Sequence, residues 1–235
     1  MLKKTIIIPC FNEIKTIEKV INRVKNYINQ ADNIVVVDDC STDGTTQLLK
    51  NIENSNRYSG LKLYFHNENL GKGSAIKTAL RSNTINDIII IQDADLEYNP
   101  RDYSKLMLPF DETDADVVYG SRFLGGSNYV RIHFFWHYIA NKILTFLCNM
   151  FSNLNLTDME TGYKAFRKSA LADINLKEKS FGIEPEITLK FAKKKLKFYE
   201  VSVSYQGRSY EEGKKIGIKD AFVAIYCIFK YGFFN

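Results

Sequence analysis

The feature that most constrains the fold is a run of four consecutive isoleucines at residues 88–91. A strand with one face in water alternates apolar and polar residues, whereas this run does not alternate, as expected of a strand covered on both faces. Similar short apolar runs predict strands at residues 5–8, 34–37, 61–65 and 117–119. Between them, apolar residues recur three and four positions apart, for example from Ile14 to Ile28, which is typical of amphipathic helices. This alternation predicts an α/β fold with a mostly parallel central sheet flanked by helices.

The C-terminal half has a different order of elements. Its spacing predicts a long helix over 139–154, a strand near 163–166, a helix from 186 to about 195, a strand over 198–204 and a helix from 218 to about 231. It contains no repeat, low-complexity stretch or linker. We therefore expect one domain over 1–235 with a specialised C-terminal part.

Composition and charge exclude several classes of protein. Hydrophobic residues make up 45% and charged residues 25% of the 235 residues, which excludes a disordered chain. The net charge of +5 is too small to indicate a nucleic-acid-binding protein, and it is unevenly distributed. Residues 1–120 hold 14 basic and 17 acidic side chains, and residues 121–235 hold 18 and 10. Four scattered cysteines and the absence of a signal pattern predict a reducing, cytoplasmic location.

Two apolar segments, 132–157 and 221–229, raise the question of membrane contact. Neither contains the run of about 20 apolar residues that a membrane span needs. Both are rich in aromatic residues and have basic residues nearby, so they could lie on an anionic membrane surface as interfacial helices. They could equally pack in the core, and the sequence alone leaves both interpretations open.

Acidic residues follow the first two predicted strands, and ligands of parallel sheets bind beyond the carboxyl ends of the strands. Glu13, after Asn12, suits the cap of a helix. Asp38 and Asp39 would repel each other unless a ligand or solvent used them, and an Asp at this position suits a hydrogen bond to a ribose or base.

Cationic residues occur at three more of these ends. Gly71, Lys72 and Gly73 open a predicted helix, where backbone N–H groups and the Lys72 cation could approach a phosphate. Arg122 ends the fifth strand and could clamp a phosphate with two hydrogen bonds. The polar loop 206–215 carries two further cations, although a solvated hairpin would also explain it.

The strongest chemical signal follows the isoleucine run. In an extended chain Asp93, Asp95 and Glu97 would project to one side and form an acidic comb. Buried unpaired carboxylates are costly, and Mg²⁺ or Mn²⁺ removes that cost by taking one or two carboxylates and completing its shell with water and phosphate oxygens. A solvated turn leading to Pro100 is the alternative.

Seven motifs in order carry a resemblance that covers nearly the whole chain: Ile-Ile-Pro-Cys-Phe-Asn-Glu, Val-Val-Asp-Asp-Cys-Ser-Thr-Asp-Gly-Thr, Asn-Leu-Gly-Lys-Gly-Ser-Ala, Asp-Ala-Asp-Leu-Glu, Gly-Ser-Arg, Asp-Met-Glu-Thr-Gly-Tyr-Lys and Glu-Pro-Glu-Ile. Together they resemble inverting glycosyltransferases of family 2 with the GT-A fold. The closest resemblance is to the polyprenyl-phosphate branch, of the dolichyl-phosphate mannose synthase type. It implies a nucleotide- and metal-binding half over 1–120 and an acceptor-side half, with candidate membrane contact, over 121–235.

The resemblance also implies roles for individual residues. The nucleoside pocket would be lined by Pro9, Phe11, Glu13, Val37 and Asp39, with Lys72 among the donor-binding residues. The metal would be held against the diphosphate by the Asp-x-Asp element Asp93, Ala94 and Asp95, with Glu97 as a further ligand. Donor or acceptor phosphates would meet Arg122, Arg208 and Lys214. The acceptor-side motif corresponds to Asp158, Glu160, Thr161 and Gly162. Phe11 replaces a frequent Tyr, and His137 stands where the branch can carry Arg.

The implied reaction moves a sugar from a nucleoside-diphosphate sugar to a polyprenyl phosphate, such as dolichyl or undecaprenyl phosphate, at the cytoplasmic membrane face. A phosphate acceptor is already ionised, whereas a hydroxyl of a glycan or lipid-linked saccharide would need a general base, for which Asp158 or Glu160 is the candidate. Transfer to such a hydroxyl is the first alternative. The second is a nucleotide-sugar-binding protein that has lost catalysis, against which the intact acidic comb argues.

Overall fold

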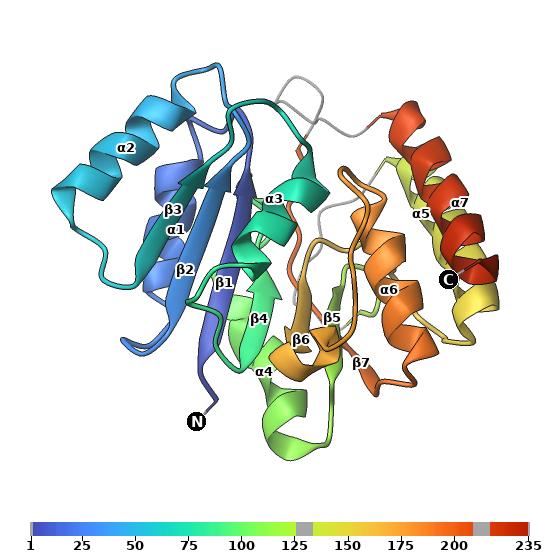
Figure 1. Ribbon diagram of the computed structural model, residues 1–235. Helices are drawn as coiled ribbons and strands as arrows, with labels where there is room; N and C mark the ends of the chain where they lie inside the picture. The colour runs from blue at the N-terminus through green and yellow to red at the C-terminus, as the bar shows by residue number, and fades with distance from the viewer. Residues whose placement is uncertain (1, 126–133, 209–216, 235) are drawn as a thin grey trace.

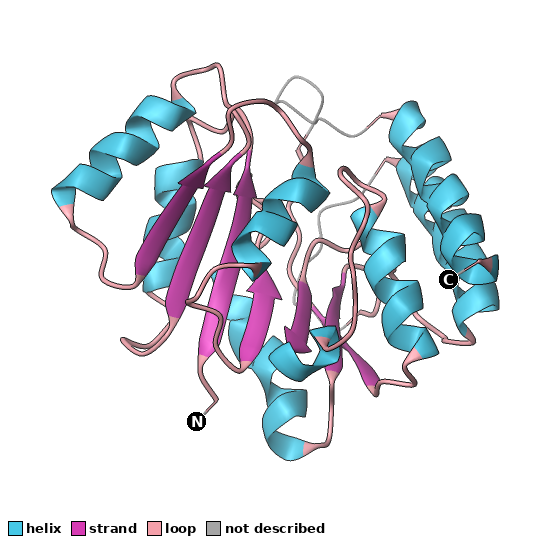
Figure 2. Ribbon diagram, viewed as in Figure 1, coloured by secondary structure: helices cyan, strands magenta, loops and turns pink. Residues whose placement is uncertain are grey.

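The computed structural model describes residues 2–125, 134–208 and 217–234 of the chain (Figure 1). Seven strands form one sheet in the order β3-β2-β1-β4-β6-β5-β7 (Figure 2). Their bounds are β1 Lys4–Cys10, β2 Asn33–Asp38, β3 Leu61–Phe65, β4 Ile88–Ile91, β5 Val117–Ser121, β6 Lys164–Arg167 and β7 Phe198–Ser202. All seven predicted strands are thereby confirmed, with ends that differ by no more than two residues.

The sheet is mostly parallel, as predicted, with one exception. β6 runs antiparallel to both of its neighbours, β4 and β5, whereas every other neighbouring pair is parallel. The sequence did not predict this reversal. Because β6 comes from the C-terminal half and lies between two strands of the N-terminal half, the two halves share one sheet.

Helices cover both faces of the sheet, which explains the isoleucine run. Ile88 and Ile90 pack in one apolar cluster, Ile89 and Ile91 in the other, and all four are buried. The first cluster includes residues of α1 (Ile17–Lys25), α2 (Thr45–Ser55) and α4 (Tyr103–Glu112). The second includes residues of α3 (Lys72–Leu80), α5 (Phe135–Ser152), α6 (Ile183–Lys193) and α7 (Ile218–Phe233). The predicted helix over 14–28 is shorter than expected, since only its middle is helical.

The two apolar segments form α5 and α7, which lie side by side at the outer edge of the molecule (Figure 1). They bury one face against α6 and the sheet through Leu144, Cys148, Ala224 and Cys227. Among the described residues, no helix is both long and apolar enough to cross a membrane.

Candidate active site

A cavity of about 1040 Å³ lies at the carboxyl ends of β1, β2, β4 and β5, the edge at which the sequence predicted a site. It is large enough for a nucleotide and part of a second substrate. The predicted site residues in its wall are Pro9, Phe11, Glu13, Asp39, Lys72, Asp93, Ala94, Asp95, Glu97, Arg122, Glu160, Gly162 and Arg208. The N-terminal ends of α5 and α7 close the far side, through residues such as Trp136, Asn141 and Ala221.

Four of the residues to which the resemblance assigns roles lie elsewhere. Thr161 is fully buried, and its hydroxyl donates to the Gly120 carbonyl oxygen. Val37 is fully buried in the core below the cavity, because both faces of β2 are covered. Asp158 is buried behind Arg122 and does not line the cavity. Lys214 lies outside the described residues.

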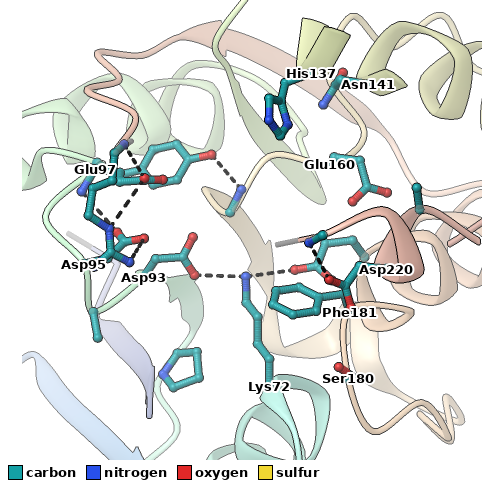
Figure 3. Close-up of a pocket in the computed structure, with 18 of the residues that line it drawn as sticks. Lys72, Asp93, Asp95, Glu97, His137, Asn141, Glu160, Ser180, Phe181 and Asp220 are labelled. Atoms are coloured by element: carbon teal, nitrogen blue, oxygen red, sulfur yellow. Dashed lines mark hydrogen bonds and ion pairs between the residues drawn. The ribbon is translucent and has the colours of Figure 1, made fainter. Parts of the chain in front are cut away.

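The acidic comb does not form as predicted, because the chain turns directly after β4. Residues 94–97 form a turn and bend, and Leu96 has a left-handed backbone with φ of 65°. The carboxylates of Asp93, Asp95 and Glu97 therefore point in different directions from this turn (Figure 3). In the described part of the chain, no three or more His, Cys, Asp and Glu side chains are grouped to hold a metal.

Asp93 points to the middle of the cavity, where its carboxylate meets Lys72. The Lys72 Nζ lies 2.9 Å from Asp93 and 2.9 Å from Glu184, so it bridges two acidic residues (Figure 3). Gly162 makes room for this arrangement, since a Cβ atom at that position would lie 2.1 Å from Asp93 Oδ2. Any side chain at residue 162 would displace the Asp93 carboxylate.

Arg208 holds the other two carboxylates of the turn. Its guanidinium binds Asp95 at 3.2 Å and both oxygens of Glu13 at 3.0 and 3.1 Å. Glu97 accepts hydrogen bonds from the Arg208 backbone N–H and from the Tyr205 hydroxyl, at 2.7 and 2.6 Å. Arg208, one of the two arginines predicted to bind phosphate, thus lies at the acidic turn. Through Glu13 and Asp95 it connects the ends of β1 and β4 to the C-terminal half.

The electrostatics of the turn fit a divalent cation bound together with phosphate oxygens. Burial and the negative charges of Asp93 and Glu97 raise the pKa of Asp95 to about 8, even though Arg208 opposes the shift. The existing cations therefore do not neutralise the carboxylates of the turn. Mg²⁺ and Mn²⁺ take one or two carboxylates and complete their shell with phosphate and water, so two carboxylates such as Asp93 and Asp95 would be enough for such an ion.

Asp38 and Asp39 are satisfied within the protein, contrary to the expectation that a ligand or solvent would use them. Asp38 accepts hydrogen bonds from the hydroxyls of Ser41 and Thr46. Asp39 accepts bonds from the backbone N–H groups of residues 70 and 71 and contacts His66 Nδ1 at 2.7 Å. Asp39 nevertheless lines the cavity, where it fixes the loop that leads to α3.

The glycines before and within α3 allow close packing against the loop before α6, a role that the sequence did not predict, and their predicted approach to a phosphate stays a prediction. A Cβ at Gly71 would lie 2.4 Å from the Lys179 carbonyl oxygen, and one at Gly73 would lie 2.7 Å from that of Glu178. The Ser74 N–H donates to the Lys179 carbonyl. The loop before α6 therefore packs on the N-terminus of α3, and Gly71, Lys72 and Ala75 of this segment line the cavity.

Arg122 forms a buried ion pair with Asp158. The carboxylate accepts two bonds from the guanidinium at 2.7 Å each and one from the Arg122 backbone N–H at 3.0 Å, and Asn141 donates a fourth at 3.1 Å. These bonds hold the pKa of Asp158 below its usual value despite burial. Glu160 differs, because burial and the charge of Glu184 raise its pKa to about 7. Of the two candidate bases, Glu160 is thus the better proton acceptor.

The sequence did not assign a role to two residues of this arrangement. His66 connects Asp39 to Thr78 of α3. The one sequence feature that could have indicated this role is its position just before the Gly71 loop. Glu184 belongs to the Glu-Pro-Glu-Ile motif, but the motif did not reveal that Glu184 would meet Lys72. Both connections span long sequence separations, which local patterns do not encode.

Comparison with known proteins agrees with this geometry. Residues 5–174 match the family model described as glycosyl transferase family 2. A UDP-N-acetylglucosamine–dolichyl-phosphate N-acetylglucosaminyltransferase of Methanococcus voltae is 28% identical, over 94% of this chain and 92% of that protein. An undecaprenyl-phosphate mannosyltransferase of Micrococcus luteus is 26% identical, over 90% of this chain and 86% of that protein.

Solved structures share the fold. Glucosyl-3-phosphoglycerate synthase from Mycobacterium tuberculosis, in complex with Mn²⁺, uridine diphosphate and phosphoglyceric acid, superposes with a TM-score of 0.74 at 17% identity. The superposition covers 100% of this chain and 80% of the synthase. The family match spans more than half of the chain and the site lies at the expected edge of the sheet; the chain therefore belongs to glycosyl transferase family 2 and is a nucleotide-sugar glycosyltransferase with the GT-A fold.

Proposed function

We propose that this protein transfers a sugar, with inversion, from a nucleoside-diphosphate sugar to a polyprenyl phosphate. The relatives named above act on dolichyl phosphate and undecaprenyl phosphate, which supports this class of acceptor. The observation that carries the proposal is the cavity itself. Its wall joins the acidic turn, suited to a metal-bound diphosphate, to the ends of two helices with exposed apolar faces.

The reaction is a single displacement. An oxygen of the acceptor phosphate forms a bond to the anomeric carbon, and the bond from that carbon to the diphosphate oxygen breaks, so that the electron pair leaves with the nucleoside diphosphate. The acceptor phosphate is ionised at neutral pH, and no residue has to remove a proton. Lys72 and Arg208 orient the diphosphate and compensate the negative charge that it gains.

Asp93 and Asp95 would hold Mg²⁺ or Mn²⁺, which when bound supplies Lewis-acid stabilisation of the leaving diphosphate. Solved structures of the same fold contain Mn²⁺ or Mg²⁺. Glu97 is a further candidate ligand. As in Asp95, both of its oxygens accept hydrogen bonds, which a bound cation would replace in part.

Membrane contact is part of the proposal. We infer that the outer faces of α5 and α7 lie on an anionic membrane surface, so that a lipid-linked phosphate enters the cavity between the helix ends. Large apolar side chains on these helices are strongly exposed, including Trp136 at 76%, Phe146 at 63%, Phe222 at 69% and Tyr226 at 64%. An aromatic face of this kind, beside basic residues, is suited to the interface of a bilayer.

A hydroxyl acceptor is the second candidate, and Glu160 favours it. Its raised pKa, near 7, suits a general base, and it lines the cavity. Such an acceptor would require proton removal, whereas a polyprenyl phosphate would not.

The decisive experiment supplies the purified protein with Mn²⁺, UDP-, GDP- and dTDP-sugars, and either undecaprenyl or dolichyl phosphate. We expect a polyprenyl-phosphate sugar, detected by mass spectrometry, with inverted anomeric configuration. Transfer to saccharide hydroxyls alone, abolished in Glu160→Gln, would replace the proposal by the second candidate. Donor binding without any transfer would indicate a protein that has lost catalysis.

A further inference from the structure

Two buried carboxyl groups line the cavity on the side of Lys72 opposite to the acidic turn. Glu184, in the first turn of α6, is 5% exposed, and its Oε1 pairs with Lys72 at 2.9 Å. Its Oε2 is buried, and no described residue forms a hydrogen bond with it. Glu160 Oε1 is likewise buried and lacks a partner among the described residues.

Among the described residues, no cation other than Lys72 forms an ion pair with these two carboxyl groups. The charge of Lys164 acts on both, but its ammonium group donates hydrogen bonds to the carbonyl oxygens of Met159 and Thr161. Lys72 is shared between Glu184 and Asp93. A buried acceptor that lacks a donor destabilises the protein, and a bound group with suitable donors would remove this cost.

The surroundings restrict what can bind. Lys72 extends between Asp93 and the part of the cavity that contains Glu160 and Phe181 (Figure 3). The Phe181 ring lines the cavity, with its centroid 6.0 Å from Lys72 Nζ. This part of the cavity therefore offers carboxylate acceptors and an apolar ring face, a combination that suits a neutral group with several O–H or N–H donors. A second anion would be repelled by both carboxylates.

We propose that Glu160 and Glu184 bind the sugar ring of the donor, by accepting hydrogen bonds from its hydroxyl or amide groups, and exclude sugars that carry a carboxylate. This inference rests on the proposed donor, a nucleoside-diphosphate sugar. The diphosphate lies at the acidic turn and the sugar beyond Lys72, so Lys72 marks the boundary between them. Rotation about the last side-chain bond lets either carboxyl oxygen meet the ligand.

The test compares binding of a nucleotide sugar with binding of the same nucleoside diphosphate, by calorimetry in the presence of Mn²⁺. The nucleotide is the one that stabilises the wild-type protein most in a thermal-shift panel of UDP-, GDP- and dTDP-sugars. We expect Glu160→Gln and Glu184→Gln each to weaken the neutral sugar nucleotide about 5- to 20-fold relative to the diphosphate, as for the loss of a hydrogen bond to a charged group. The preference for the neutral sugar over its uronic-acid counterpart should fall about tenfold in the same variants.

The control is Glu178→Gln. Glu178 is a carboxylate of the neighbouring loop that pairs with Lys230 and does not line the cavity. The ratio of the two affinities should remain unchanged in this variant. An unchanged ratio in both Glu160→Gln and Glu184→Gln overturns the sugar subsite, including the case in which both ligands weaken equally. Wild-type protein that binds no nucleotide sugar overturns the subsite and the proposed function together, whereas intact sugar discrimination without transfer to polyprenyl phosphate overturns only the latter.

Discussion

The cavity and the outer faces of α5 and α7 differ in which side chains they bury and which they expose. In and directly behind the cavity wall, the protein buries carboxylates, such as Asp158 at 0% exposed, and pairs them with arginine and lysine. On α5 and α7 it exposes aromatic side chains such as Trp136, which is 76% exposed. Both arrangements are unfavourable in an isolated soluble protein, since buried charges and exposed apolar patches each carry a cost. The two partners that we propose, a nucleoside-diphosphate sugar for the cavity and a membrane surface for the helices, would remove these two different costs.

The largest expected effect is on stability, and it concerns the buried ion pair between Arg122 and Asp158, which forms without a bound ligand. Asp158→Asn leaves the Arg122 guanidinium without its counter-charge, which should lower the free energy of unfolding by about 3–5 kcal/mol. Thermal unfolding followed by circular dichroism should show a fall in Tm of roughly 6–20 °C. Glu18→Gln, which removes an exposed pair with Arg57, should leave Tm unchanged. Equal Tm values for both variants would show that the Asp158 pair does not support the cavity wall.

The acidic turn should matter for activity. Asp95→Asn removes a proposed metal ligand and a partner of Arg208, and we expect transfer to fall at least about 100-fold. Product formation at saturating Mn²⁺ measures the effect. Asp111→Asn, at an exposed position of α4, provides the matched control and should retain activity. Retained transfer in Asp95→Asn would contradict the proposed role of the turn.

The pH dependence of the free energy of unfolding tests the raised pKa of Glu160, which lies in the cavity wall with Glu184. Because burial and Glu184 raise the pKa of Glu160 to about 7, the native state keeps this proton at pH values where the unfolded chain has lost it. Stability should therefore decrease as the pH rises from about 4.5 to 7, by about 1–3 kcal/mol. Urea unfolding across this range should show a smaller decrease for Glu160→Gln than for the wild type. Parallel curves would refute the shift.

The smallest effect on stability is expected at the apolar face. Phe222→Ser should change the free energy of unfolding by no more than about 0.5 kcal/mol, because Phe222 is 69% exposed. Binding to vesicles that contain anionic lipid should nevertheless weaken several-fold, as measured by co-sedimentation. Leu108→Ser, at a side chain of α4 that is 50% exposed, is the control and should not affect vesicle binding. Equal vesicle binding by all three proteins would exclude this face as the membrane contact.

Local patterns in the sequence predicted the strands, the faces of the helices and the edge at which the site lies. The isoleucine run at 88–91 predicted a central strand, and Asp93 and Asp95 beyond it do line the cavity. The turn at Leu96 was predicted only as the alternative to the acidic comb, because a left-handed residue other than glycine leaves no mark in the spacing of carboxylates. Patterns could not predict that Arg122 would bind Asp158, or that Lys72 would bind Glu184. Those contacts depend on how distant segments meet in the sheet and its loops.

The position of β6 has a consequence for how this chain reaches its native state. During synthesis, β1 to β5 leave the ribosome before β6, and until then β4 and β5 lack the strand that separates them. Their open backbone groups would be free to pair with other chains, which is a known route to aggregation. A nascent chain that ends after β5 would therefore need protection, for example by a chaperone. A truncated protein of residues 1–120 would keep most of the acidic turn, yet we expect it to be insoluble rather than an independent nucleotide-binding unit.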